Sequence, residues 1–209
     1  MKLDQLRRAA TECHACPLWE RATQTVFGEG PPHAVLMLVG EIPGDREDRD
    51  GRPFVGPAGL LLDQALAAAQ VPRAHVYITN AVKHFKWEPR GRRRIHKKPN
   101  AREIAACHQW LEGEIAVVAP RLIVALGATA AQALLGREFR LTQARGEVQP
   151  SAWGIPVIAT VHPAAILRIP EREARQRERE AFFADIGKAA RHARERAASG
   201  RALSGRLAS

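Results

Sequence analysis

The sequence has few cysteines, few aromatic residues and no long uncharged apolar run. Its 3 cysteines are too few for a disulfide framework, which indicates a reducing, cytoplasmic setting. No stretch approaches the roughly 18 consecutive apolar residues of a membrane span, so we expect no membrane association. The first residues, MKLDQLRRAATEC, also lack the apolar core of a secretory signal.

Hydrophobic residues nevertheless make up 45% of the 209-residue chain, which is enough for a sizeable core and excludes disorder throughout. The length suits one domain of ordinary size. We expect a single domain over residues 1–198, a flexible tail over residues 199–209, and a monomer.

Positive charge dominates, with a formal net charge of +10 and a pI near 10.5, and this favours a polyanionic partner. Residues 83–103 hold nine Lys and Arg against two acidic residues. This segment contains Pro89, Gly91 and Pro99 and is predicted to be a loop. A basic loop of one sign suits contacts with phosphates, although a merely solvated loop is the alternative. Residues 171–209 alternate in sign, as a solvated amphipathic helix does.

Apolar runs alternate with helical patterns along the chain. This order predicts a parallel sheet covered by helices on both faces. In the helical pattern over residues 100–119, Asn100 is placed as the N-cap and Glu103 completes a capping box. The predicted strands are residues 35–40, 76–82, 121–127 and 156–162; helices are expected over 57–70, 100–119 and 128–136, and from 163.

The cysteines have the spacing of a metal site. Cys13 and Cys16 form a C-x2-C pair, and Cys107 lies on the inward face of a predicted helix, where a simple core cysteine is the alternative. Zinc and iron–sulfur clusters both usually take four protein ligands. His84, just after a predicted strand, is the candidate fourth ligand, and the spacing alone leaves the choice of metal open.

Polar and aromatic side chains gather where the predicted strands end. Glu41 follows the first strand, Asn80 lies at the end of the second, and His162 ends the fourth. Phe54 stands in a loop rich in Gly and Pro instead of on an apolar face. Because ligands bind beyond the carboxyl ends of parallel strands, this combination indicates a pocket of the size of a nucleobase.

The motifs together resemble the uracil-DNA glycosylase superfamily, in particular its iron–sulfur family 4. They span most of the chain: CHACP (13–17), GEIPG (40–44), PFVGPAG (53–59), TNAVKH (79–84), Cys107, LGATAA (126–131) and VHP (161–163). Two features resemble the cross-linking UdgX branch of the superfamily. These are His84, where family 4 has a cysteine, and the basic segment RRRIHKKP (92–99).

The resemblance implies a three-layer α/β/α sandwich around a central four-stranded parallel sheet. It also decides between the metals, because it implies a 4Fe–4S cluster held by Cys13, Cys16, His84 and Cys107. Its role would be to order the N-terminal segment and the basic loop.

The resemblance further implies a uracil site that acts on a flipped base. Phe54 would stack on uracil, and Asn80 would pair with its polar edge. Gly40, Ile42 and Asp45 would complete the pocket. At position 42, however, the cross-linking branch usually has Gln and family 4 has Ala, and Ile can only pack.

Catalysis is assigned by the same resemblance to three residues. His162 would donate to the uracil carbonyl, and Glu41 would stabilise the cationic sugar or accept a proton. His96 would attack the sugar and leave the protein covalently bound to the abasic site. DNA phosphates would be held by Arg93, Arg94, Lys97 and Lys98.

Two alternatives remain beside this covalent mechanism. In the first, the protein is a turnover glycosylase of the family 4 kind, and His96 only grips DNA. In the second, it is a noncatalytic iron–sulfur module that binds nucleic acid. For either enzyme the expected partner is uracil-containing DNA, with single strands preferred because they need no unpairing.

Overall fold

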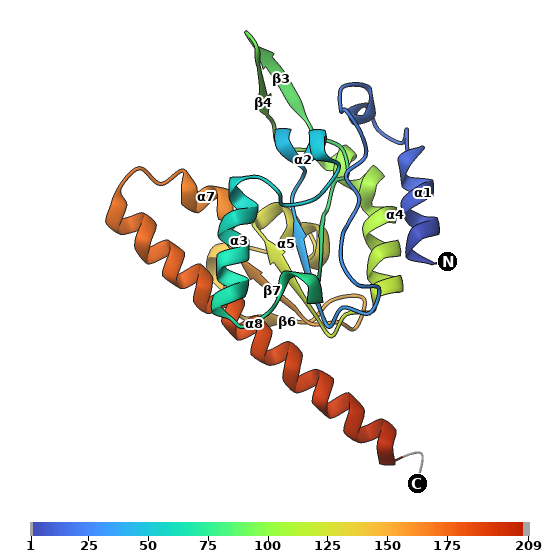
Figure 1. Cartoon of the computed structure of the whole chain (residues 1–209), viewed down its shortest axis with the longest axis vertical. Coiled ribbons are helices and arrows are strands. Elements are labelled where there is room, and N and C mark those ends of the chain that lie inside the picture. Colours follow the sequence, from blue (N-terminus) through green and yellow to red (C-terminus); the bar gives the residue numbers. More distant parts are fainter. Residues whose placement is uncertain (1, 207–209) are drawn as a thin grey trace.

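A parallel sheet forms the centre of the computed structural model, which describes residues 2–206 and, from residue 200 on, only the backbone (Figure 1). The strand order is β2-β1-β5-β7-β6, and the first four of these strands are parallel. Their bounds are β1 Leu36–Gly40, β2 Val76–Asn80, β5 Leu122–Leu126, β7 Val157–Thr160 and β6 Val148–Gln149. The four predicted strands are therefore confirmed, each shortened by one to three residues.

The sheet has one strand more than the sequence predicts. β6 pairs antiparallel with β7, with Val148 opposite Ile158 and Gln149 opposite Val157. A two-residue strand carries no readable alternation of polar and apolar residues, so its pairing depends on its neighbour. The parallel four-stranded centre is unchanged by this short edge.

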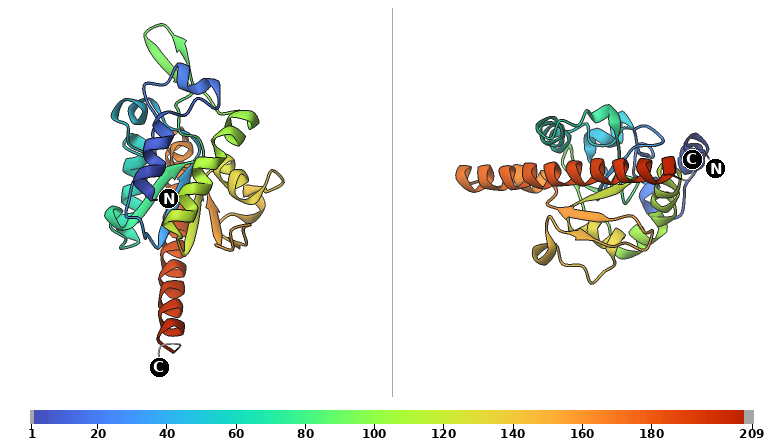
Figure 2. Two further views of the ribbon diagram at one scale, coloured as in Figure 1. Left: turned by 90° about the vertical axis from the view of Figure 1, so that its right-hand side faces the viewer. Right: turned by 90° about the horizontal axis from the view of Figure 1, so that it is seen from below.

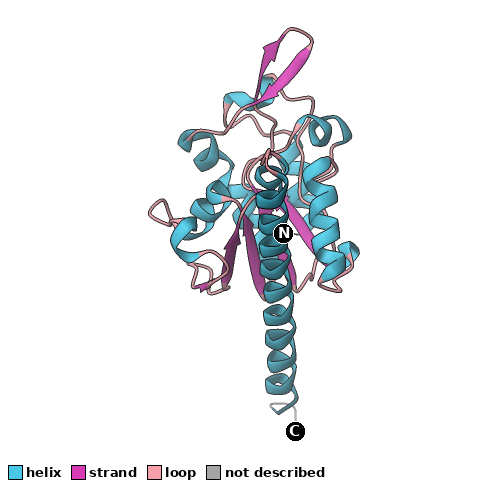
Figure 3. Cartoon of the chain, turned by 90° about the vertical axis from the view of Figure 1, so that its left-hand side faces the viewer, coloured by secondary structure: helices cyan, strands magenta, loops and turns pink. Residues whose placement is uncertain are grey.

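Helices cover both faces of the sheet, which confirms the three-layer α/β/α arrangement (Figure 3). Successive strand residues point to opposite faces, so Met37 and Val39 pack under α1, α4 and α5. Leu36 and Leu38 pack instead under α3 and α8. The bounds are α1 Leu3–Thr11, α3 Pro57–Ala68, α4 Ala101–Val118, α5 Ala128–Leu135 and α8 Arg172–Arg206.

The start of α4 confirms the predicted capping box. Asn100 Oδ1 accepts the backbone N–H of Glu103 at 2.9 Å, and Glu103 Oε2 accepts the backbone N–H of Asn100 at 2.7 Å. Shorter helices complete the fold. They are η1 Pro17–Glu20, α2 Asp45–Asp50, η2 Arg73–His75, α6 Leu141–Ala144 and α7 Pro163–Leu167.

The basic segment is a β-hairpin, so the prediction of a loop is wrong. β3 (Trp87–Arg90) pairs antiparallel with β4 (Arg93–His96), and the hairpin projects from the body (Figures 1 and 2). Gly91 has a φ of +58° and supplies the left-handed residue that a two-residue turn requires. Pro89 is tolerated because the ribbon has only two strands, each with a free edge.

The last helix, α8, continues through Arg206 and extends beyond the body of the protein (Figure 2). Its helical backbone therefore passes Ser199, where the predicted tail begins, and residues 207–209 lie outside the described part. In the part of the chain that the structure describes, no helix combines the length and apolar character needed to cross a bilayer.

Candidate active site at the carboxyl ends of the strands

Gly40 and Asn80 stand side by side at the ends of β1 and β2. A Cβ atom at Gly40 would lie 2.3 Å from Asn80 Oδ1 and 2.6 Å from the Phe54 ring. Only glycine therefore fits at position 40, and its absence of a side chain brings the amide and the ring together. The amide of Asn80 makes no hydrogen bond to other described residues, so it is free to pair with a ligand.

The loop that carries Phe54 is held by a buried carboxylate. Glu47 Oε1 accepts the backbone N–H groups of Val55 at 3.1 Å and Gly56 at 2.8 Å. Phe54 itself has a φ of +54°, a strained value for an aromatic residue. The carbonyl of Phe54 lies 1.9 Å from where a Cβ of Gly59 would be, so a side chain at position 59 would push the loop away.

His162 caps the first turn of α7 and faces Phe54, with 5.8 Å between ring centroids. Its Nδ1 accepts the backbone N–H of Ala164 at 3.1 Å. Burial lowers the pKa of His162 to about 4, and Arg168 and His96 add to that effect. The ring is therefore neutral at pH 7, and its single proton is on Nε2, ready to be donated.

His96, the last residue of β4, reaches this site from the hairpin. Partial burial lowers the pKa of His96, Arg168 adds to this, and the nearby carboxylate of Glu41 opposes it. The His96 ring lies 5.9 Å from that of Phe85 between centroids. A neutral imidazole close to Glu41 and His162 can accept a proton or act as a nucleophile.

Asp45 and Arg94 bind each other, whereas the sequence analysis assigned one to uracil and the other to DNA. The Arg94 guanidinium forms ion pairs with Asp45 and with Asp48, the latter at 2.6 Å. It also lies over the rings of Phe85 and Trp87, at 5.3 and 5.6 Å from their centroids. Asp45 and Arg94 thus fix the hairpin to α2, and their predicted ligand contacts stay untested.

The other predicted DNA contacts lie on or beside the hairpin. Arg93 and Lys98 are exposed, and Arg93 closes the turn opposite Arg90. Lys97 is partly exposed and forms an ion pair with Glu88 at 2.7 Å. The positions of Arg93 and Lys98 suit phosphate contacts, which remain a prediction.

Ile42, which the resemblance assigns to the uracil pocket, packs towards the cysteines, and its contact with uracil stays a prediction. It is buried in an apolar cluster with Leu18, Val82 and Cys107. Cys16 packs against the same cluster. Because Ile42 is buried among apolar side chains, a polar side chain there would need a buried partner.

The three cysteines lie in one neighbourhood. The pKa of Cys107 is raised to about 11, mainly by burial and to a smaller extent by the other two cysteines, while Lys83 opposes this rise. Burial also raises the pKa of Cys16, and Cys13 adds to this. Two N–H groups donate to sulfur: the Trp110 indole to Cys13 at 3.1 Å and the Lys83 backbone to Cys107 at 3.2 Å.

His84 has the correct tautomer for a ligand. The Thr25 hydroxyl donates to the carbonyl of Ala10 at 3.1 Å, so its oxygen accepts the Nε2–H of His84 at 2.9 Å. Nδ1 then carries the lone pair, and burial lowers the pKa of this histidine. Within residues 2–206, however, no three His, Cys, Asp or Glu side chains converge at the spacing of metal ligands. Three thiols and one imidazole are suitable ligands for an iron–sulfur cluster, although their side chains are farther apart than the ligands of a bound metal.

Two buried residues that the sequence analysis missed lie beneath Asn80. Lys83 Nζ donates to Glu114 Oε2 at 2.5 Å and to the Asn80 carbonyl at 2.7 Å. Glu114 also accepts from Tyr77 and Thr79, and it raises the pKa of Tyr77 beyond what burial alone does. The lysine of TNAVKH could have signalled this, because a charged residue inside an apolar segment requires a partner.

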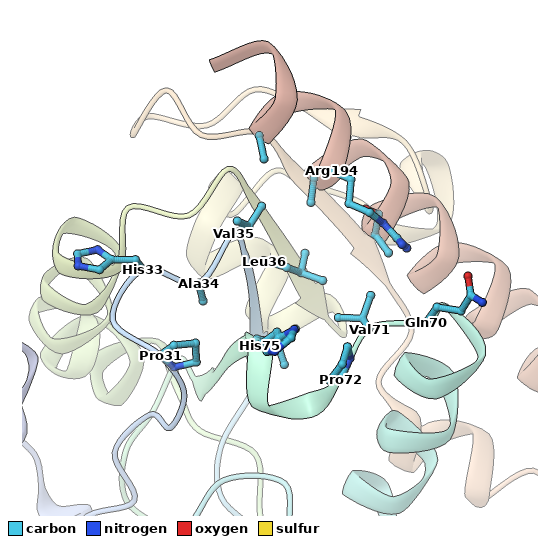
Figure 4. A pocket seen from close by; sticks show the side chains of 14 residues that line it. Pro31, His33, Ala34, Val35, Leu36, Gln70, Val71, Pro72, His75 and Arg194 are labelled. Atoms are coloured by element: carbon cyan, nitrogen blue, oxygen red, sulfur yellow. The ribbon is translucent and has the colours of Figure 1, made fainter. Parts of the chain in front are cut away.

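A separate cavity of about 640 Å³ lies at the opposite end of the sheet (Figure 4). Leu36 and Val76, the first residues of β1 and β2, line it, together with Ala193 of α8. Its wall is mostly aliphatic, with His33 and His75 as its histidines. Gln70 supplies an amide there, but the lining residues include no carboxylate and no Phe, Tyr or Trp, in contrast to the carboxyl ends of the strands.

Comparison with known proteins agrees with this geometry. The family model described as uracil DNA glycosylase superfamily matches residues 27–187. The type-4 uracil-DNA glycosylase of Pyrobaculum aerophilum is 39% identical over 177 residues, which are 81% of this chain and 87% of that protein. The type-4 enzyme of Thermotoga maritima is 40% identical over 168 residues, 79% of this chain and 83% of that protein.

A third relative extends over still more of the chain. The type-4 uracil-DNA glycosylase of Archaeoglobus fulgidus is 36% identical over 192 residues, 88% of this chain and 92% of that protein. The residues that the family model matches include the strand-end site. The chain belongs to the uracil-DNA glycosylase superfamily, and type-4 enzymes are among its relatives.

Proposed function

We propose that this protein is a uracil-DNA glycosylase that hydrolyses the bond between uracil and deoxyribose and then turns over. The proposal rests on the proximity of Phe54, Asn80 and His162 at one edge of the parallel sheet. The similarity to enzymes named type-4 uracil-DNA glycosylases, over 79–88% of this chain, supports hydrolytic turnover over covalent capture.

Recognition of the base follows from the free amide of Asn80. Uracil presents an acceptor next to a donor along its edge, and a carboxamide offers both complementary groups. Cytosine reverses part of this pattern, so it would leave a buried polar group unpaired. Phe54 provides the flat surface on which the flipped base stacks.

Departure of the base is assisted by His162. As the C–N bond breaks, its electron pair leaves with uracil and negative charge grows on the ring oxygens. The Nε2–H of the neutral imidazole donates to one of these oxygens and stabilises that charge. A cationic sugar remains, and the carboxylate of Glu41 stabilises it electrostatically.

Hydrolysis is completed by water. The oxygen of water bonds to the anomeric carbon of the sugar, and its proton passes to Glu41. In this mechanism His96 holds the DNA next to the site. The products are free uracil and an abasic site, and the enzyme is released.

Covalent capture by His96 is the second candidate, and the position of this ring favours it. His96 reaches the site from the hairpin, near Glu41, and is kept neutral by a lowered pKa. A ring nitrogen would bond to the anomeric carbon, and the ring proton would pass to Glu41. The adduct would then end the reaction after one turnover.

One experiment distinguishes the two outcomes. A labelled single-stranded oligonucleotide with one uracil is supplied in tenfold excess, and samples are run on denaturing gels. Repeated turnover and alkali-sensitive strands are expected for hydrolysis. A band that withstands SDS and heat, and that disappears in His96→Ala, would replace hydrolysis by capture. No cleavage and no adduct would contradict both.

We also propose that Cys13, Cys16, Cys107 and His84 hold a 4Fe–4S cluster. The shared neighbourhood of the thiols, the two N–H groups donated to sulfur and the free Nδ1 of His84 support this set. When bound, the cluster would act as a structural cross-link between the N-terminal segment, β2 and α4. Iron and sulfide analysis of the wild type and of His84→Ala tests the assignment, since loss of iron in the variant is expected.

The proposed partner is uracil-containing DNA, with single strands preferred. The exposed arginines of the hairpin and Lys98 would contact its phosphates. A monomeric state and a cytoplasmic location complete the proposal.

A further inference from the structure

Lys83 lies between the uracil site and the cysteines, and no step of the mechanism uses it. Its side chain is 1% exposed and that of Glu114 is 0% exposed. Burying an amino group and a carboxylate is costly unless each finds full hydrogen bonding. A buried pair next to an active site therefore calls for an explanation beyond stability.

All three donors of the Lys83 ammonium group are used. Nζ donates to Glu114 Oε2 at 2.5 Å, to Thr79 Oγ1 at 2.7 Å and to the carbonyl of Asn80 at 2.7 Å. The last two acceptors belong to the final residues of β2. Lys83 therefore holds the end of the strand from below, while the Asn80 amide points to the pocket.

The other end of the network is equally fixed. Glu114 also accepts the backbone N–H of Gly28 at 3.0 Å, the Tyr77 hydroxyl at 2.9 Å and the Thr79 hydroxyl at 3.0 Å. The ion pair with Glu114 therefore fixes the position of the Lys83 ammonium group, because the Glu114 carboxylate is itself held by these three hydrogen bonds.

The backbone of Lys83 faces the cysteines. Its N–H donates to Cys107 Sγ at 3.2 Å, and its carbonyl accepts the N–H of Val26 at 2.8 Å. Between the two sites, Ala81 and Val82 donate to the carbonyls of Gly40 and Glu41. One short segment therefore joins the amide that reads uracil to the neighbourhood of the sulfurs.

We propose that Lys83 is a positioning residue that sets the base preference of the site by fixing Asn80, an inference that rests on the proposed recognition of uracil. The ammonium group immobilises the Asn80 carbonyl, so the amide is presented at one angle. Without it, the strand end relaxes and the amide discriminates less well between uracil and cytosine.

The test uses a paired substitution, Lys83→Met with Glu114→Gln, so that no buried charge is left alone. The matched control is Lys86→Met with Glu103→Gln, a second Lys–Glu pair, at 2.9 Å, between the same segment and α4 that does not contact Asn80. Affinity is measured for an oligonucleotide containing 2′-fluoro-deoxyuridine, which resists cleavage, and for its 2′-fluoro-deoxycytidine counterpart.

The Lys83 pair is expected to lower the preference for uracil over cytosine about tenfold, because one directed hydrogen bond loses its alignment. The control pair is expected to keep the wild-type preference. In an Asn80→Ala background the Lys83 pair should cause no further loss, since both changes act through the same amide. Iron content should stay at the wild-type value.

Three results would overturn the inference: an unchanged preference in the folded Lys83 pair, an additive loss on Asn80→Ala, or loss of iron together with preference. Should the pair fail to fold, Lys83→Gln with Glu114→Gln provides the same comparison, because the shorter amide does not reach the Asn80 carbonyl. If the wild type itself shows no preference for uracil, the proposed function is what fails.

Discussion

The strand-end site and the basic hairpin are built in opposite ways. At the strand ends, Asn80 and Phe54 are buried. Lys83, which is paired with Glu114, holds the Asn80 carbonyl, and Glu47 holds the loop that carries Phe54. The hairpin projects from the body, and the Arg94 ion pairs with α2 are its main polar attachment. A site for chemistry needs fixed geometry, whereas a contact to a flexible polyanion needs charge within reach.

This contrast predicts that the largest effect comes from the rigid region. His162→Ala is expected to slow uracil release about 10²–10³-fold, because it removes a donor to the developing negative charge. Single-turnover rates measure this change. His33→Ala, at the opposite end of the sheet, serves as the control and should keep the wild-type rate. Equal slowing by both variants would contradict a specific role for His162.

The second largest effect should be the loss of stability and of activity at low pH, through protonation of His162. The His162 pKa is lowered to about 4, so the folded protein favours the neutral ring. Stability from this histidine is complete above pH 6.5 and is lost as pH falls towards 4, because the unfolded chain binds the proton first. Below the His162 pKa of about 4, the rate of uracil release should decline about tenfold for each pH unit. Protonation of Nδ1 removes the acceptor for the backbone N–H of Ala164 and so releases the ring from its position. Rates and circular dichroism, followed together, separate catalysis from unfolding.

The attachment of the hairpin should matter less for chemistry and more for stability. Arg94→Ala leaves the fully buried Asp48 without its cationic partner and is expected to cost roughly 3 kcal/mol. Asp48 keeps its bonds to Thr23, which limits the loss. Urea denaturation measures the difference. Arg93→Ala, on the exposed side of the same strand, should leave stability unchanged, and equal losses in both would remove the distinction.

The two regions also differ in how well the sequence predicts them. The strand ends follow from apolar runs that stop at Gly40 and Asn80, because such a pattern is local and parallel strands end at one edge. The capping box at Asn100 is equally local. The fold class and these positions were therefore accessible without a structure.

Pairing between distant residues was not accessible. Arg94 lies 46 residues from Asp48, and Lys83 lies 31 residues from Glu114. In the sequence these residues resemble a phosphate contact and an ordinary charged position, and only folding brings their partners close. The hairpin was missed because its strands carry charge on both faces, so they lack the alternation that identifies a strand.

The smallest effect should come from a single exposed arginine of the hairpin. Arg93→Ala removes one contact to phosphate, so the slope of log affinity against log salt should fall by about 0.9 on duplex DNA. Fluorescence anisotropy between low and moderate salt measures that slope. Arg177→Ala removes one positive charge from α8, outside the hairpin, and should keep the wild-type slope. If both variants change the slope equally, net charge attracts the DNA; if only Arg93→Ala does, the hairpin is the surface that contacts it.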